Sequence, residues 1–115
     1  MRDKIPVPMR QLVQGRALGC CERCLEWAPD AHHHHRRVRG MGGSKAANRH
    51  DPSNLVQLCP VCHKWVHDYP AEAVATGFMV PRNSLLSPFD VPVVDLTGAA
   101  RLLDDEGSFE VVEHA

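Results

Sequence analysis

The stretch of sequence that decides the fold reads Cys59-Pro60-Val61-Cys62-His63-Lys64-Trp65-Val66-His67, and a second cysteine pair precedes it as Cys21-Glu22-Arg23-Cys24. A gap of two residues lets both sulfurs of a pair reach one ion at about 2.3 Å. These four thiolates therefore predict a closed, tetrahedral structural zinc site, whereas a catalytic dithiol would need only one pair. Cys20 is left over. It could replace Cys21, although its three-residue gap to Cys24 suits a zinc knuckle less well.

The length and composition of the chain limit what it can be. A chain of 115 residues is expected to form one domain. Aromatic residues make up only 5% of it, beside nine prolines and eight glycines, so we expect a modest core that needs a metal for stability. No apolar run approaches the ~18 residues that span a bilayer, and residues 1–6 lack the features of a secretory signal. We therefore expect a cytoplasmic protein whose cysteines bind metal rather than form disulfides.

Charge is distributed unevenly along the chain. Residues 1–83 have a balance of +5, and residues 84–115 have a balance of −6. This asymmetry favours a phosphate-facing body followed by an acidic C-terminal extension, although an arginine-rich loop alone is more often simply solvated. The basic cluster that follows the histidine run contains Arg36, Arg37, Arg39, Lys45 and Arg49.

The hydrophobic spacing predicts the elements before the second cysteine pair. Residues 9–18 have helical spacing and are followed by Gly19, a common residue after a helix end. Residues 25–39 are expected to hold a short strand that ends in the histidine run. Residues 40–53 are rich in glycine, asparagine and serine and predict an extended loop. Residues 54–58 predict a second short strand.

The second half of the chain is expected to begin with a helix. This helix starts near Val61 and stops at Pro70, and it places His63 and His67 on one face because they are four residues apart. Residues 71–80 predict a further helical turn. The segments 101–103 and 109–112 flank a turn that contains glycine, which favours a small β-hairpin.

The histidines exceed what the four-cysteine site needs. Residues 32–35 are four consecutive histidines, and the two cysteine pairs would bring them close to His63 and His67. Two imidazoles from the helix and one from the strand would give three protein ligands, which leaves open positions that are typical of a catalytic metal site. The alternative is a solvated histidine-rich loop that binds metals loosely.

The order of several motifs in this chain resembles an HNH endonuclease. They are His34-His35, the stretch Arg36-Arg37-Val38-Arg39-Gly40-Met41-Gly42-Gly43, and then Asn54, His63 and His67. The resemblance is greatest to the small HNH proteins of bacteriophages and their bacterial hosts, and it covers roughly residues 10–80. It implies a small α+β fold with a ββα-metal (His-Me finger) core, stapled by the two-knuckle zinc site and carrying an N-terminal helix. Residues 1–83 would form the nuclease domain, with its core motif at 20–70, and residues 84–115 would lie outside the motif.

The resemblance also implies roles for individual residues. His34, His63 and His67 would hold the catalytic ion, His35 would be the general base, and Asn54 would orient the loop that bears the base. The five basic residues named above would contact DNA phosphates. The register within the histidine run stays open, because His33 could replace His34 and His32 could be a bystander.

The activity implied is hydrolysis of DNA phosphodiester bonds by a histidine-activated water with one divalent ion, in a bacterial host cell. Many members have aspartate where His34 stands, and an all-imidazole set favours Zn²⁺, Ni²⁺ or Mn²⁺ over Mg²⁺. DNA is the expected partner, together with phage packaging proteins, and no membrane is expected. The competing interpretation is a zinc-stabilised DNA-binding module that does not cleave. A zinc deaminase is disfavoured because the sequence lacks its His-x-Glu segment.

Overall fold

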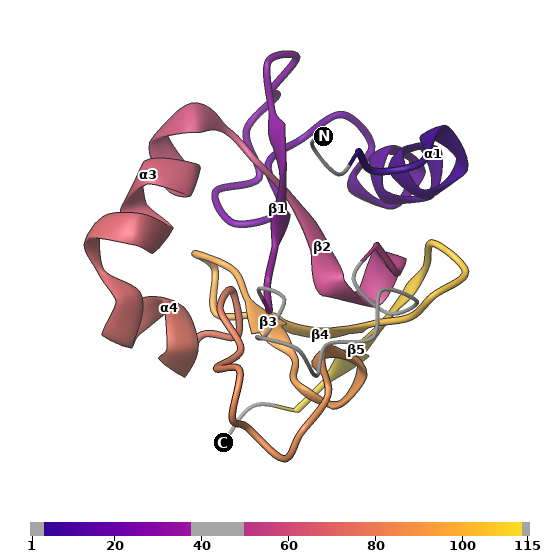
Figure 1. Ribbon diagram of the computed structural model, residues 1–115. Coiled ribbons are helices and arrows are strands. Elements are labelled where there is room, and N and C mark those ends of the chain that lie inside the picture. Colours follow the sequence, from indigo (N-terminus) through magenta and orange to yellow (C-terminus); the bar gives the residue numbers. More distant parts are fainter. Residues whose placement is uncertain (1–3, 38–49, 114–115) are drawn as a thin grey trace.

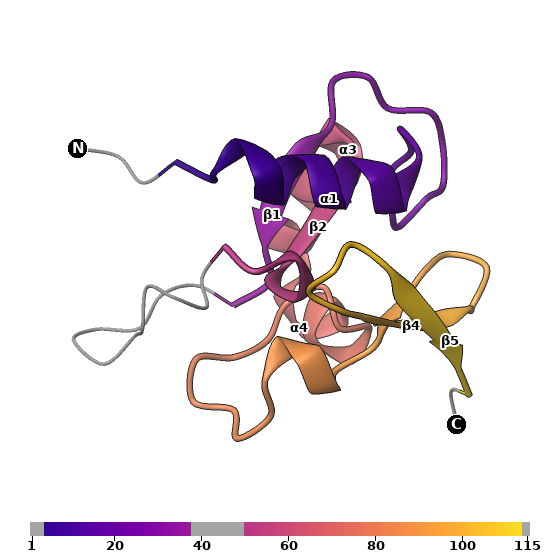
Figure 2. The same ribbon diagram turned by 90° about the vertical axis from the view of Figure 1, so that its right-hand side faces the viewer.

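A two-stranded sheet lies between two helices in the first part of the chain (Figure 1). The computed structural model describes residues 4–37 and 50–113. Strand β1 (His32–His35) pairs antiparallel with β2 (Leu55–Leu58), and His32 stands opposite Leu58. Helix α1 (Val7–Ala17) covers one side of this sheet and α3 (Pro60–Asp68) covers the other, as Figures 1 and 2 show together. The histidine run is therefore a strand, as predicted.

Helix α1 begins and ends as its sequence indicates. Pro6 precedes it and a proline occupies its first turn, where a missing backbone N–H costs nothing. The helix ends at Leu18, which adopts a left-handed φ of 54° and donates its N–H to the carbonyl of Gln14 at 2.9 Å. The predicted helix at 9–18 is confirmed, with its bounds shifted toward the N-terminus. It buries Val13 and Arg16 against the sheet.

The strand and helix around the second cysteine pair form one continuous buried unit. All four side chains of β2 are buried, because α1 and α3 cover its two faces. Helix α3 starts directly after Cys59, whose sulfur accepts a hydrogen bond from the N–H of Cys62. It ends before Pro70, where the short helix α4 (Pro70–Ala75) begins. The predicted helix between Val61 and Pro70 is confirmed.

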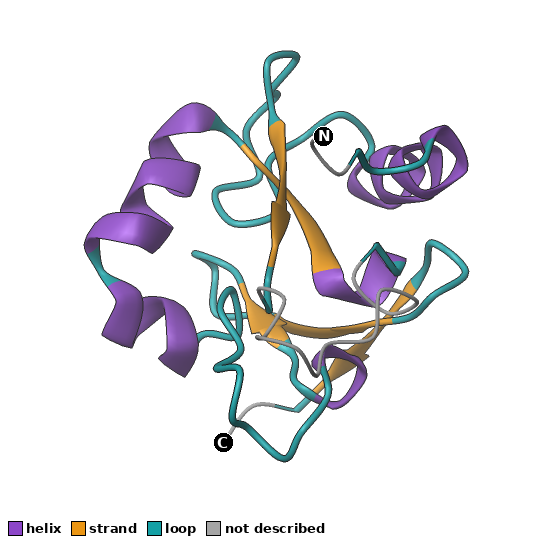
Figure 3. Ribbon diagram, in the orientation of Figure 1, coloured by secondary structure: helices purple, strands orange, loops and turns teal. Residues whose placement is uncertain are grey.

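A second sheet lies in the C-terminal part of the chain (Figure 3). Its antiparallel strands run in the order β3 (Val93–Val94), β4 (Ala100–Leu103) and β5 (Phe109–Val112). The hairpin predicted at 101–103 and 109–112 is confirmed as β4 and β5, while β3 was not predicted. Two short 3-10 helices, η1 (Pro52–Asn54) and η2 (Pro88–Asp90), complete the described elements.

One hydrophobic core joins both parts of the chain. Val93 and Leu103 from the second sheet belong to the same buried cluster as Val56 and Val66. The acidic residues of this region also make structural contacts, since Asp105 accepts a hydrogen bond from the N–H of Ser53 at 3.0 Å. The predicted domain boundary between residues 83 and 84 stays a prediction. The described part of the acidic segment that follows it packs on the rest of the described chain. Among the described residues, no helix has both the length and the apolar character needed to cross a membrane.

Arg36 occupies the interior rather than the surface. Its side chain is fully buried, and its guanidinium donates to the carbonyls of Gly77 at 2.8 Å, Ser53 at 2.7 Å, Pro88 at 2.9 Å and Val91 at 2.5 Å. Burial, and the nearby charge of Arg16, lower its pKa to about 9, so it remains charged at neutral pH. The prediction that Arg36 contacts a DNA phosphate is wrong, because backbone carbonyls bind all of its nitrogens and no surface is left for a ligand.

We expect Arg36→Lys to lower the free energy of unfolding by about 3 kcal/mol, because one ammonium group cannot reach carbonyls from three separate loops. Urea unfolding followed by circular dichroism measures the change. The matched control is Arg82→Lys, which alters an exposed arginine and should change stability by less than about 0.5 kcal/mol. Equal effects of the two substitutions would contradict the structural role of Arg36.

Candidate metal centres

The first cysteine pair forms a tight turn that directs its sulfurs inward. An antiparallel bridge between Cys20 and Trp27 closes the base of this turn. Inside it, the backbone N–H groups of Arg23 and Cys24 approach the sulfur of Cys21 at 3.4 and 3.5 Å. These donors stabilise a thiolate, which is the form of cysteine that binds a metal.

The second pair meets the first at a spacing that suits zinc. The four sulfurs of Cys21, Cys24, Cys59 and Cys62 all lie within 4.8 Å of one another. Between the two turns, the sulfurs of Cys24 and Cys59 are 3.9 Å apart. Two thiolates bound tetrahedrally to one ion at about 2.3 Å would be about 3.8 Å apart. The cluster therefore fits a structural zinc ion, and Cys20 lies outside it, with its sulfur directed at the carbonyl of Leu18.

The thiols of the cluster differ in their electrostatic surroundings. Burial raises the pKa of Cys21, but backbone hydrogen bonds, among them those from Cys24 and Arg23, outweigh it and leave this pKa below its ordinary value. Burial raises the pKa of Cys62 strongly, so the free thiol would stay protonated without a metal. The guanidinium of Arg23 lies 3.3 Å from the sulfur of Cys62 and stacks on the ring of Trp65. Its charge offsets part of the negative charge that four thiolates would bring.

A buried ion pair ties the first cysteine turn to its surroundings. Arg16 from α1 binds both carboxylate oxygens of Glu22 at 2.7 Å. The same guanidinium donates to the carbonyls of Pro52 and Leu55, and Glu22 also accepts from the N–H of Gln57. Bidentate, fully satisfied pairs of this kind fix geometry more than they add stability. The turn is thereby held against both α1 and β2.

We expect the purified protein to contain one tightly bound zinc ion, and Cys24→Ser to lose it together with a large part of its thermal stability, because the metal joins two distant segments. Elemental analysis and thermal unfolding measure both effects. Cys20→Ser is the matched control, and it should keep the zinc and the melting temperature of the wild type. A zinc content that is unchanged in Cys24→Ser, or lost in Cys20→Ser, would contradict this assignment.

A second cluster contains imidazoles from β1 and α3. Ring nitrogens of His34, His63 and His67 all lie within 4.8 Å of one another. The Nε2 atoms of His63 and His67 are 3.3 Å apart. Two nitrogen ligands at about 2.0–2.1 Å from a tetrahedral ion would be separated by about 3.3–3.4 Å. The spacing of four residues on α3 thus gives the two imidazoles a separation that fits one shared ion.

The orientation of His34 is fixed by its environment. Its Nε2 donates to the carbonyl of Phe78 at 3.0 Å, which makes Nδ1 the nitrogen with a lone pair. Burial is the main cause that lowers its pKa to about 4, with a smaller contribution from the neighbouring imidazoles, so the ring is neutral at physiological pH. His32 lies at the other side of His63, with their Nδ1 atoms 2.9 Å apart. The structure thus brings His34, not His33, to the two helix histidines.

His35 lies on the opposite face of β1 from His34, because successive strand residues point to opposite sides. It is not part of the three-histidine cluster. Its Nε2 lies 3.2 Å from Nδ1 of His50, a residue that the sequence analysis did not single out. An isolated histidine that follows a basic stretch of sequence gives no signal of its own. Only the pairing of β1 with β2 places it beside His35.

Asn54 connects the two strands beyond their paired residues. Its Oδ1 accepts from the N–H of Arg37 at 2.9 Å, and its Nδ2 donates to the carbonyl of the same residue at 3.2 Å. These two bonds fix the backbone two residues after His35. Arg37 itself donates to the carbonyls of Ser84 and Leu86. The remaining predicted phosphate contacts, Arg39, Lys45 and Arg49, lie outside the described residues.

Comparison of the chain with models of known protein families, with curated proteins and with solved structures gives no match in any of the three. The geometry of the two clusters is therefore the basis for the function proposed below.

The stability of the protein should depend on pH through His34. Its ordinary pKa of 6.5 falls to about 4 in the folded chain, so the unfolded chain binds more protons between these values. The free energy of unfolding should then fall as the pH drops through this range. Without added divalent ions, we expect the wild type to lose about 2 kcal/mol more than His34→Gln between pH 7 and pH 5. Urea unfolding at both pH values measures the difference, and His32→Gln, a change in an exposed ring of the same strand, should keep most of the wild-type slope.

Proposed function

We propose that this protein is a metal-dependent endonuclease of the HNH type, which hydrolyses phosphodiester bonds in DNA. The observation that supports this most strongly is the convergence of His34 from β1 with His63 and His67 from α3. Two antiparallel strands followed by a helix that carries two ligands correspond to the arrangement expected for a ββα-metal core. No other part of the described chain brings three histidines together.

The ligand set fits a divalent ion with open positions. Three neutral imidazoles leave room for water and for an oxygen of the substrate, which distinguishes this cluster from the closed four-cysteine site. An ion held there would act as a Lewis acid on a phosphate oxygen and offset charge on the leaving oxygen. The all-nitrogen ligand set favours Zn²⁺, Ni²⁺ or Mn²⁺ over Mg²⁺.

His35 is the proposed general base. A neutral imidazole is suited to take a proton from water near pH 7, and such catalysis contributes about 10²–10⁴-fold in rate. If Nε2 of His35 carries the proton that faces His50, Nδ1 is the basic nitrogen. Because His34 and His35 point to opposite sides of β1, a phosphate at the end of the strand would have the base on one side and the ligand cluster on the other. In-line attack requires that arrangement.

Asn54 is the proposed positioning residue for the base. Both of its amide atoms bind the backbone of Arg37, so it sets the path of the chain that leaves His35. Loss of these two bonds would displace the imidazole without removing it, and a small displacement of a reacting group is costly in rate. Arg37 and the basic residues outside the described part of the chain remain the proposed phosphate contacts.

The test is nicking of a supercoiled plasmid with Mg²⁺, Mn²⁺, Ni²⁺ and Zn²⁺ in turn. We expect the wild type to cleave with at least one ion, and His35→Ala to lose about 10²-fold or more in rate while it still binds DNA. His67→Ala should abolish cleavage by loss of a ligand. Asp68→Ala is the matched control, since it changes the adjacent exposed residue and removes only a surface ion pair with Lys64.

One outcome would overturn the nuclease proposal, and a second would overturn only the role of His35. If the wild type binds DNA but cleaves it with none of the four ions, the protein is a zinc-stabilised binding module. If His35→Ala cleaves at the wild-type rate while His67→Ala does not, the metal centre stands and His35 is not the base.

A further inference from the structure

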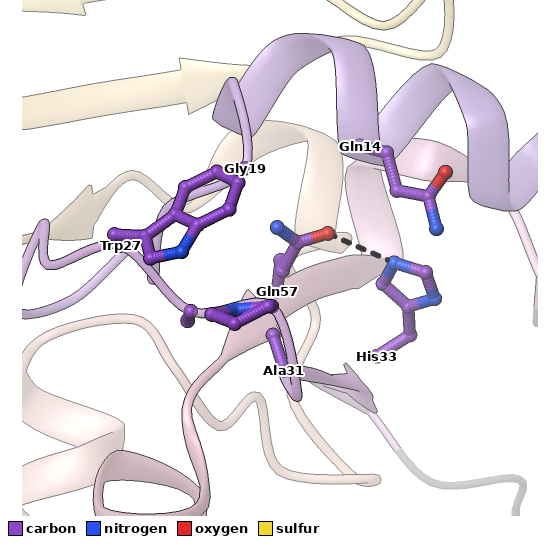
Figure 4. A pocket seen from close by; sticks show the side chains of 8 residues that line it. Gln14, Gly19, Trp27, Ala31, His33 and Gln57 are labelled. Atoms are coloured by element: carbon purple, nitrogen blue, oxygen red, sulfur yellow. Dashed lines mark hydrogen bonds between the residues drawn. The ribbon is translucent and has the colours of Figure 1, made fainter.

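A pocket of about 270 Å³ opens on the sheet face that α1 covers, away from the three-histidine cluster. It lies between α1, the first cysteine turn and the two strands (Figure 4). In that view Trp27 forms one side, Gln14 and His33 form the other, and Gln57 lies between them. None of these residues belongs to either metal centre. The remaining lining residues are small or apolar, namely Gly19, Ala28, Pro29 and Ala31.

Trp27 is an aromatic platform with a fixed orientation. It is 71% exposed, which is unusual for the largest apolar side chain. The edge of its ring lies against Gly19, where a Cβ atom would come within 2.4 Å of Cζ3. The backbone bridge to Cys20 holds the residue from the other end. A large ring that is exposed yet cannot rotate freely is suited to stack on a planar ligand at low entropic cost.

The polar side chains of the pocket are also held in place, in this case by hydrogen bonds. Gln57 is buried, and its Nε2 donates to the carbonyl of Cys20 at 3.2 Å. Its Oε1 therefore faces Nε2 of His33, at 3.1 Å, and must accept from it. With its Nε2 as the donor, the neutral ring of His33 has Nδ1 as a hydrogen-bond acceptor. Gln14, exposed on α1, adds an amide that can both donate and accept.

A positive charge stands at the same side of the pocket. Arg10 is exposed and lies one turn before Gln14 on α1, so both project from one face of the helix. An anionic group attached to a planar ligand would meet Arg10 there.

We propose that this pocket binds a nucleobase of single-stranded DNA. The base stacks on Trp27, its polar edge faces Gln14 and His33, and its phosphate lies toward Arg10. A paired base inside a duplex exposes no face for stacking, so the site selects unpaired nucleotides. The inference rests on the proposed function only for the choice of DNA as the polymer. It adds a binding site that is separate from the cleavage centre.

The experiment uses the full, zinc-loaded chain with Trp65→Phe, which leaves Trp27 as the single indole. It also carries His67→Ala, so that the proposed cleavage cannot consume the DNA. We expect a 15-nucleotide single strand to quench the fluorescence of Trp27 in a saturable way. The same sequence as a duplex should quench it much less. Binding measured by anisotropy of a labelled strand should weaken about 10-fold or more in Trp27→Ala.

Three further variants distinguish stacking from a general loss of structure. Trp27→Phe should restore part of the affinity because it retains an aromatic face, and Gln14→Ala should weaken binding without disturbing the ring. Phe89→Ala is the matched control, since it removes an aromatic side chain of 50% exposure outside the pocket. Circular dichroism confirms that each variant is folded.

The outcomes separate this inference from the proposed cleavage. Absence of saturable quenching, or wild-type affinity in Trp27→Ala, overturns the base-binding site even if the wild type nicks plasmids. Saturable quenching of Trp27 by the single strand, together with an affinity measured by anisotropy that falls in Trp27→Ala, supports the site even if no ion supports cleavage. Quenching of equal size by duplex and single strand would also overturn it, because the pocket would then not select unpaired bases.

Discussion

The structure depends on one constraint: four sulfurs, from two turns that are far apart in the sequence, must lie within reach of one ion. Helix α3 begins at Cys59, so the position of this cysteine in the cluster also sets where the helix starts and which way it runs. His63 and His67 follow within two turns and reach β1 as a consequence. The ion pair between Arg16 and Glu22 also holds the first cysteine turn against α1. The two candidate metal centres are therefore parts of one scaffold, in which the cysteines position the histidines.

The elements that depend on local pattern could be predicted from the sequence. The spacing of the cysteines identified their cluster, and the four-residue spacing of His63 and His67 placed both on one face of a helix. The histidine run is a strand although it has no apolar alternation of its own. The burial of its side chains nevertheless alternates, because the buried strand β2 pairs with it and α3 covers one of its faces. Adjacent histidines thereby acquire different surroundings.

Features that depend on contacts between distant segments could not be predicted. Arg36 stands beside Arg37 in a basic run and has the appearance of a surface residue, yet its acceptors come from residues far along the chain. The same limit applies to His50, which meets His35 only when the strands pair. The acidic residues after position 84 suggested an appendage by their charge. Asp95 instead pairs with Arg101, and Asp105 accepts a hydrogen bond from the backbone N–H of Ser53. The second sheet, to which this region belongs, packs on the common core.

The burial of Arg36 also has a consequence for the order in which the chain folds. Two of its carbonyl partners, Pro88 and Val91, lie 52 and 55 residues further along the chain. An N-terminal segment that lacked them would have to bury a guanidinium with unsatisfied donors, or leave the centre of its core open to water. Contacts of such long range slow folding, since the loop between them must close first. The core around Arg36 can therefore be completed only once the residues up to Val91 are present.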